Sequence, residues 1–120
     1  MNKPRIEGKG SDHYPDLLLA ISKGIQQDRE FNIHQLSRLM YMSRYTLHRY
    51  CVQTTGLSPG RLIRSVRLKK ASQLLSQKKW TISDIAFDVG FNSSSYFSTE
   101  FKKHHGVCPD KWVSDTSLAS

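Results

Sequence analysis

Hydrophobic positions recur at helical spacing along most of this chain. Residues 14–27 place Leu17, Ile21 and Ile25 at the i, i+4, i+8 spacing of an amphipathic helix. No stretch alternates apolar and polar residues in the way that a half-buried strand requires. Short polar turns separate the helical stretches. The pattern therefore predicts an all-α fold.

An internal repeat organises the chain after the first helix. Two segments 49 positions apart share an aromatic residue, a capping residue, a polar residue at the third helical position and an apolar residue at the fourth: 31–36 (FNIHQL) and 80–85 (WTISDI). Asn32 with Gln35, and Thr81 with Asp84, resemble capping boxes, in which side chains satisfy free amides at a helix start. Two helices are therefore expected to begin in the same way.

Each copy continues as a second helix that ends at a glycine. Past the turn the offset becomes 50, so the second copy has one extra turn residue. Gly56 precedes Pro59, and Gly106 precedes Pro109, which suits a helix exit because glycine adopts the left-handed conformation and proline prevents continuation. Helix, short turn, helix and glycine stop make a helix-turn-helix.

Between the copies, residues 59–77 carry apolar side chains over a broad arc of a helical wheel, as expected of a helix that packs against both copies. Such a helix is roughly 28 Å long, close to the ~34 Å between successive turns of a DNA groove. The predicted fold is two helix-turn-helix subdomains joined by a long central helix, a homeodomain-like pair. The domain would cover 14–113, with subdomains at about 14–57 and 80–113, a flexible leader or linker remnant at 1–13 and a flexible tail at 114–120.

Positive charge is concentrated in the middle of the chain. The 120 residues carry 18 Lys and Arg against 10 Asp and Glu, a net charge of +8. All acidic residues lie outside residues 31–83, a stretch that carries ten Lys and Arg. Solubility alone explains many basic proteins, but a long stretch without acids indicates a polyanionic partner.

The second helix of each copy supplies candidate base-reading residues, because this helix enters the major groove in helix-turn-helix proteins. In the first copy Tyr45, His48 and Arg49 share one face, and an arginine there can form a bidentate contact with guanine. The matching residues in the second copy are hydroxyls, which give weaker readout: Ser95, Ser98 and Thr99. The first copy is expected to supply most of the specificity and the second to supply affinity and positioning. The alternative is a solvated helix face.

Further residues are candidates for phosphate contacts because they are basic or carry a hydroxyl near a predicted helix start. They are Arg38, Arg44, Thr46, Arg64, Ser94, Lys102 and Lys103, and the connecting helix adds Arg61, Arg67, Lys69 and Lys70. A solvated surface position is at least as good an interpretation for six of the basic residues taken singly: Arg38, Arg61, Arg64, Arg67, Lys69 and Lys70.

Neither a catalytic centre nor a metal site can be assembled from these residues. The five His and two Cys do not have zinc-ligand spacing, and no P-loop or GxSxG motif is present. The longest apolar run has five residues, whereas a membrane-spanning helix needs roughly 20. We expect no enzyme activity, no cofactor, no metal, no membrane partner and a cytoplasmic location.

The residues taken together resemble the DNA-binding domain of the AraC/XylS family of bacterial transcription regulators. The resemblance covers about residues 14–112 and is carried by six segments in order: 42–49 (MSRYTLHR), 55–59 (TGLSP), 63–71 (IRSVRLKKA) with 74–75 (LL), 82–91 (ISDIAFDVGF), 95–98 (SYFS) and 101–103 (FKK). Any one segment would be weak evidence, but all of them at this spacing are highly specific.

The resemblance implies two helix-turn-helix subdomains that insert into successive major grooves of double-stranded DNA. It also implies that the protein regulates transcription, usually by activation and often by contact with RNA polymerase. Family members commonly carry an arginine where this chain has Thr99, which weakens the case for base readout by the second copy. Glu100 beside it would repel phosphates if it faced DNA.

Most members of this family have a sensing domain, and 120 residues leave no room for one. Either the chain is a small stand-alone regulator, or it is the output piece of a longer protein, such as a hybrid two-component regulator. Because residues 1–13 resemble the end of a linker, we favour the second interpretation.

Other functions fit less well. An RNA reader would show stacking aromatics on strands or a GxxG loop, a membrane binder would need an exposed apolar helix face, and a DNA-modifying enzyme would need an activated nucleophile or metal. A non-specific nucleic-acid-binding module or a protein-interaction module of a larger regulator stays open as the alternative. A steep fall of affinity with salt would distinguish DNA binding from protein interaction.

Overall fold

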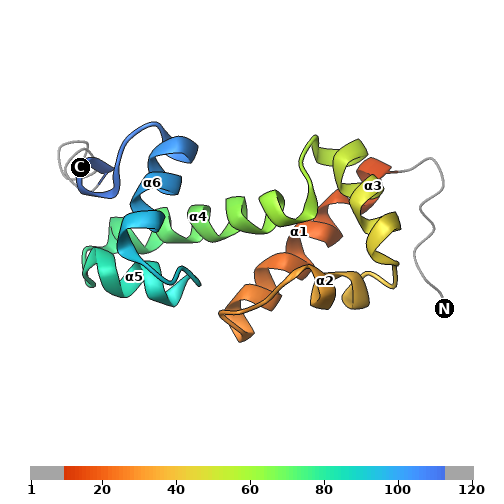
Figure 1. Ribbon diagram of the computed structural model, residues 1–120, viewed down its shortest axis with the longest axis horizontal. Helices are drawn as coiled ribbons and strands as arrows, with labels where there is room; N and C mark the ends of the chain where they lie inside the picture. Colours follow the sequence, from red (N-terminus) through yellow and green to blue (C-terminus); the bar gives the residue numbers. More distant parts are fainter. Residues whose placement is uncertain (1–9, 113–120) are drawn as a thin grey trace. The chain divides into compact units, whose positions relative to one another are not determined.

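The computed structural model describes residues 10–112, and this range contains helices and no strand (Figure 1). In chain order they are α1 (Gly10–Gln27), α2 (Ile33–Leu39), α3 (Arg44–Thr55), α4 (Pro59–Gln77), α5 (Ile82–Asp88) and α6 (Ser94–His105), followed by a helical turn at residues 109–112. The predicted all-α class is confirmed. The predicted tail and residues 1–9 of the predicted leader lie outside the described residues.

The first helix starts earlier than the sequence pattern indicates. α1 begins at Gly10, four positions before Tyr14, so the last residues of the predicted leader are helical. The apolar spacing could not show this, because residues 10–13 carry no apolar side chain that would mark a buried face. Within the described range, no helix is long and apolar enough to cross a membrane.

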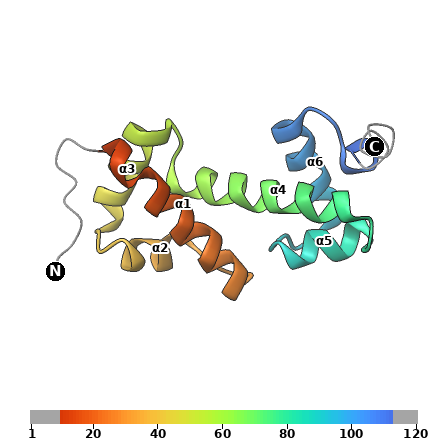
Figure 2. The same ribbon diagram turned by 180° about the vertical axis from the view of Figure 1, so that it is seen from behind.

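The chain divides into two compact units, and the boundary between Val66 and Arg67 falls inside α4. In the first unit α1 contacts both α2 and α3, as the two views show (Figures 1 and 2). Its core joins these helices to the first half of α4 through fully or almost fully buried side chains, among them Leu17, Ile21, Leu36, Leu47, Leu62 and Ile63.

The second unit is built from the remainder of α4 with α5 and α6. Its core contains Leu68, Ala71, Leu75, Ile85, Val89, Phe97 and Phe101. Thus the first half of α4 contributes to one core and the second half to the other, as the broad apolar arc predicts. A helix with a single buried stripe could not serve both.

The internal repeat is confirmed at the level of individual backbone hydrogen bonds. In the turn after α2 the Met42 amide donates to the Ser37 carbonyl at 3.0 Å, and in the turn after α5 the Phe91 amide donates to the Ala86 carbonyl at 2.9 Å. The residue before each of these amides has a positive φ, 57° at Tyr41 and 103° at Gly90. The first copy therefore places a tyrosine in a conformation that favours glycine.

The second helix of each copy begins at a serine cap and ends at the glycine that the sequence predicts. The Ser43 hydroxyl accepts from the Thr46 amide at 3.1 Å to start α3, and the Ser93 hydroxyl accepts from the Tyr96 amide at 3.0 Å to start α6. Both helices end at left-handed glycines, at residues 56 and 106, with φ of 81° and 88°.

The two predicted capping boxes differ. In α2 the box is complete, because Asn32 accepts from the Gln35 amide and Gln35 accepts from the Asn32 amide, each at 3.0 Å. In α5 the Thr81 hydroxyl accepts from the Asp84 amide at 3.0 Å. The Asp84 carboxylate is one methylene shorter than a glutamine side chain, and the return bond is not part of this cap.

Candidate nucleic-acid interface

The exposed face of α3 carries the three side chains predicted to contact bases in the first copy. Leu47, Tyr50 and Cys51 are buried and hold the opposite face of the helix against the first core. Consequently Tyr45, His48 and Arg49 point away from the core and are all exposed, Tyr45 to 71%.

Tyr45 and Arg49 contact one another on this face. The guanidinium carbon of Arg49 lies 5.8 Å from the centre of the Tyr45 ring, within the range of a cation–π interaction. At an exposed site such a contact contributes about 0.5–1 kcal/mol, enough to favour one orientation of a long side chain. The geometry thus presents a partly ordered guanidinium whose N–H donors remain accessible to a ligand.

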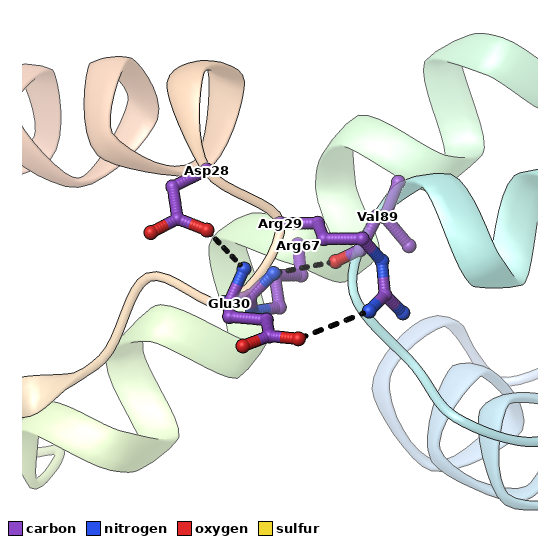
Figure 3. A network of polar contacts seen from close by, with 5 residues as sticks. All are labelled: Asp28, Arg29, Glu30, Arg67 and Val89. Carbon is purple, nitrogen blue, oxygen red and sulfur yellow. Dashed lines mark hydrogen bonds and ion pairs between the residues drawn. The ribbon is translucent and has the colours of Figure 1, made fainter.

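No acidic residue occurs on α2 or α3, so the positive charge of this face is not neutralised from its own elements. The acids of the preceding turn are engaged with their own neighbours (Figure 3). Asp28 accepts from the Glu30 amide at 2.9 Å and from the Gln35 side-chain amide at 3.2 Å, and Glu30 lies 3.8 Å from Arg29.

Three residues that the sequence assigns to phosphate contacts in this unit are exposed. They are Arg38 on α2, and Arg44 and Thr46 in the first turn of α3. The Thr46 hydroxyl accepts a hydrogen bond from Ser43 at 3.0 Å, which orients it at the start of the helix. Arg64 on α4 is half-buried and has a partner within the protein.

The corresponding face of α6 is less suited to base contact. Ser95 and Thr99 are exposed and Ser98 is half-buried. The Thr99 hydroxyl donates to the Ser95 carbonyl at 3.1 Å, so its single hydrogen is used within the helix. Ser94, a predicted phosphate contact, lies 2.8 Å from the Ser83 hydroxyl.

The last turns of α6 carry its positive charge. Lys102 is exposed, and Lys103 is exposed but lies 3.5 Å from the Glu100 carboxylate. The side chain of Glu100 is only 14% exposed, so its carboxylate is largely withdrawn from solvent. The repulsion of phosphates that a solvent-facing glutamate would cause is therefore reduced.

Arg67 corrects one expectation from the sequence. It was a candidate for phosphate contact, but its side chain is buried, with 8% exposed, and it donates to the Val89 carbonyl at 2.7 Å (Figure 3). A guanidinium held in this way is not available to DNA. Its position on the helical wheel did not reveal this, because the surrounding residues of α4 include the exposed cations Arg61 and Lys69.

His105, which was assessed from the sequence only as a metal ligand, has a structural role. The His105 Nε2 atom lies 3.1 Å from the Leu68 carbonyl, and its ring centre lies 4.3 Å from that of Phe101 and 4.9 Å from that of Trp112. Burial is the main cause that lowers the pKa of the adjacent His104, and the charge of His105 lowers this pKa further. Among residues 16–112, no group of three or more His, Cys, Asp or Glu side chains is placed to hold a metal ion.

Burial also governs the chemistry of Cys51, which packs in the first core and is fully buried. It raises the pKa of the thiol to about 11. Cys51 is thus a small apolar residue rather than a nucleophile.

Comparison with known proteins agrees with this geometry. A family model described as "Helix-turn-helix domain" matches residues 36–115. An uncharacterized HTH-type transcriptional regulator of Haemophilus influenzae is 37% identical over 101 residues, which are 84% of this chain and 33% of the relative. The HTH-type transcriptional activator RhaS of Mannheimia succiniciproducens is 37% identical over 82 residues, 68% of this chain and 31% of the relative.

Histidine kinase P4 of Formosa agariphila is 35% identical over 85 residues, 71% of this chain and 6% of the kinase. The chain thus spans at most about a third of the length of these curated relatives.

Solved structures show the same fold. A transcriptional regulator of Chromobacterium violaceum, described as AraC-type, is 25% identical with a TM-score of 0.80 over 91% of this chain and 98% of its own. The C-terminal domain of AraT, a response regulator of Geobacillus stearothermophilus, is 28% identical with a TM-score of 0.69 over 82% and 84%.

The DNA-binding domain of AdpA, solved with a target DNA, shares the fold at 23% identity, with a TM-score of 0.73 over 86% of this chain and 94% of its own. The family match covers about two thirds of the chain, and the helices, caps and turns agree with it. This chain belongs to the AraC/XylS family of helix-turn-helix, DNA-binding transcription regulators, which are not enzymes.

Proposed function

We propose that this chain binds double-stranded DNA sequence-specifically in the major groove, with α3 as its main base-reading helix, and thereby regulates transcription. The observation that carries the proposal is the acid-free, exposed face of α3, on which Arg49 is held beside Tyr45. A bidentate contact from such an arginine to guanine contributes about 1–3 kcal/mol of discrimination between bases.

The second copy has a different role in this proposal. Ser95, Ser98 and Thr99 give weak readout, while Lys102 and Lys103 contact phosphates near the end of α6. Lys103 must break its ion pair with Glu100 before it can contact a phosphate, whereas Lys102 requires no such step. The second copy therefore adds affinity and fixes the position of the first on the duplex.

Three further parts of the proposal draw on the relatives. The name of RhaS supports activation as the direction of regulation, and we propose contact with RNA polymerase as its means. The kinase relative and the response-regulator domain support a sensing domain linked to this domain in one chain. A cytoplasmic location follows for a protein that acts on bacterial DNA.

A second candidate function is non-specific DNA binding, in which this domain depends on a linked domain or another subunit to select a site. The Thr99 hydroxyl favours this alternative, because its hydrogen is already donated to Ser95 within the helix.

Selection of bound duplexes from a random library at ~150 mM salt distinguishes the two functions. Sequence-specific binding predicts one enriched motif about one and a half to two helical turns long, with a stronger half that depends on Arg49. Strong, salt-sensitive binding without enrichment would support the non-specific alternative. Absence of salt-sensitive binding would contradict both.

Two variants then test the assigned roles on the selected duplex and on random DNA. Arg49→Ala is expected to abolish the preference between the two duplexes, because it removes a base contact. Lys102→Ala is the matched control and should weaken both complexes alike, because a phosphate contact carries no sequence information. Equal losses on both duplexes from Arg49→Ala would exclude Arg49 as a base reader.

A further inference from the structure

A buried arginine supports the turn of the second helix-turn-helix. Among the side chains described, buried polar or charged residues are few: Ser37, Arg67 and Ser72. Arg67 is the charged member of this set. Burying a guanidinium is costly unless it is well hydrogen-bonded, so its position calls for a specific partner.

That partner is the backbone of the turn that leads into α6. The Arg67 guanidinium donates to the Val89 carbonyl at 2.7 Å, a short distance typical of charge-assisted bonds (Figure 3). Val89 caps the C-terminus of α5, where carbonyl groups lack partners within the helix. The positive charge also suits the negative end of the helix dipole.

This turn has particular need of a restraint. It contains Gly90 at a φ of 103°, and glycine restricts the conformation of the backbone less than any other residue does. It is also one residue longer than its counterpart after α2, since Ser93 starts α6 where Ser43 starts α3. A longer turn with a glycine allows more directions for the helix that follows.

We propose that Arg67 is a positioning residue for DNA binding, which fixes the turn at Val89 and thereby orients α6 for its contacts with the duplex. The proposal rests on the proposed function of α6. Arg67 itself does not touch DNA. It acts through the backbone of the turn, so its effect should be confined to the part of the binding site that α6 contacts.

The test uses the full chain as the variants Arg67→Met and Arg67→Lys, at a temperature where circular dichroism shows the helical content of the parent. Two duplexes are compared: the selected site, and an altered site that is shortened so that it lacks the base pairs whose protection is lost in Lys102→Ala. Amide exchange at Gly90 and Phe91 is measured without DNA and reports the turn directly.

We expect Arg67→Met to accelerate exchange at Gly90 and Phe91 and to lower affinity for the selected site about tenfold, in keeping with loss of one charged hydrogen bond. Affinity for the altered site should change little. Arg67→Lys keeps a donor and should recover part of both effects. If Arg67 only stabilised the fold, a fully folded variant would retain the affinity of the parent.

Parent-like exchange at Gly90 in a folded Arg67→Met protein would overturn the proposal, as would equal losses of affinity on the two duplexes. Should Arg67→Met fail to fold, faster exchange at Gly90 in folded Arg67→Lys together with a loss of affinity confined to the selected site would support the proposal. Parent-like affinity, or equal losses on the two duplexes, in Arg67→Lys would overturn it. Failure of the proposed function is separate, because it would appear as absent salt-sensitive binding by the parent.

Discussion

Side-chain length separates the two candidate base-reading faces. His48 and Arg49 extend from α3 with ring and guanidinium donors, whereas Ser98 and Thr99 occupy the matching places on α6 with short hydroxyls. A long donor reaches base edges more readily than a hydroxyl close to the helix axis does. The difference should appear in the sequence preference of variants.

Substitution of His48 by alanine should therefore reduce the preference for the selected duplex more than Ser98→Ala does. Competition between selected and random duplexes measures this preference. Ser98→Ala is the matched control, because the two residues occupy equivalent positions in the repeat. The opposite ranking would mean that the second copy is the main base reader.

Tyr41 has a backbone conformation that is unfavourable for a residue with a side chain. Its φ of 57° costs a non-glycine residue about 1–2 kcal/mol, while its side chain is 73% exposed and contributes little to the core. Glycine would remove this strain but would add roughly 0.5–1 kcal/mol of backbone entropy to the unfolded chain. The strain is the larger effect.

Tyr41→Gly is accordingly expected to raise the free energy of unfolding by about 0.5–1 kcal/mol, measured by urea denaturation. Gly90→Ala is the reciprocal variant, because it puts a side chain at the equivalent position, and it should lower the free energy of unfolding. A loss of stability in Tyr41→Gly would show that the tyrosine ring is making a contact of greater value than the strain.

At the scale of elements, α1 approaches the following turn closely because it has no side chain at Gly24. A Cβ atom built on Gly24 would overlap the ring of Phe31, which is buried in the first core. Phe31 in turn packs with Leu36 of α2 in that core. The contact between α1 and α2 thus depends on one missing side chain.

Gly24→Ala should lower the free energy of unfolding by about 1–3 kcal/mol, the usual cost of overpacking a core. Gly60→Ala is a control on α4, where a Cβ would meet only Ile33 at 3.5 Å and the better helix propensity of alanine should stabilise the protein. Thermal and urea unfolding would measure both. Equal stability of the two variants would mean that Phe31 moves aside without cost.

Helix ends could be predicted from the sequence wherever capping chemistry is local. Ser43 before α3 and Gly56 after it are close to the residues that they satisfy, so the spacing alone identifies them. The same holds for α4, whose bounds at Pro59 and Gln77 were expected. The start of α1 was missed because its first residues present neither an apolar stripe nor a recognised cap.

Partners that are distant in sequence could not be predicted. The Arg67 guanidinium donates to the Val89 carbonyl, 22 positions later, and the His105 ring contacts the Leu68 carbonyl, 37 positions earlier. Nothing in the local pattern distinguishes Arg67 from the exposed cations around it. Thr99 shows a local limit as well, because a helical hydroxyl can either face solvent or bond to its own backbone, and the sequence does not determine which.

Taken as a whole molecule, the chain carries its excess positive charge between the acids of its two ends. Binding should therefore weaken linearly in log–log plots against salt, with a slope of about −0.9 for each phosphate contact on duplex DNA. The slope counts contacts that act together, wherever they lie along the chain. It is thus a property of the whole protein rather than of one helix.

Lys102→Ala should reduce the magnitude of this slope by about 1, as expected for loss of one phosphate contact. Lys79→Ala is the matched control, because Lys79 lies outside the candidate interface, with its ammonium 5.9 Å from the centre of the Trp80 ring. Titrations at several salt concentrations give the slope. An unchanged slope in Lys102→Ala would remove this lysine from the interface.

Both turns of the repeat are closed by main-chain amides and carbonyls, with the Met42–Ser37 bond in one copy matched by the Phe91–Ala86 bond in the other. Bonds of this kind make few demands on the identity of neighbouring side chains. Exposed residues of α3 and α6 are therefore free to mutate while the scaffold persists. Such an arrangement favours evolvability, because a descendant can acquire a new binding site on the genome without first losing its fold.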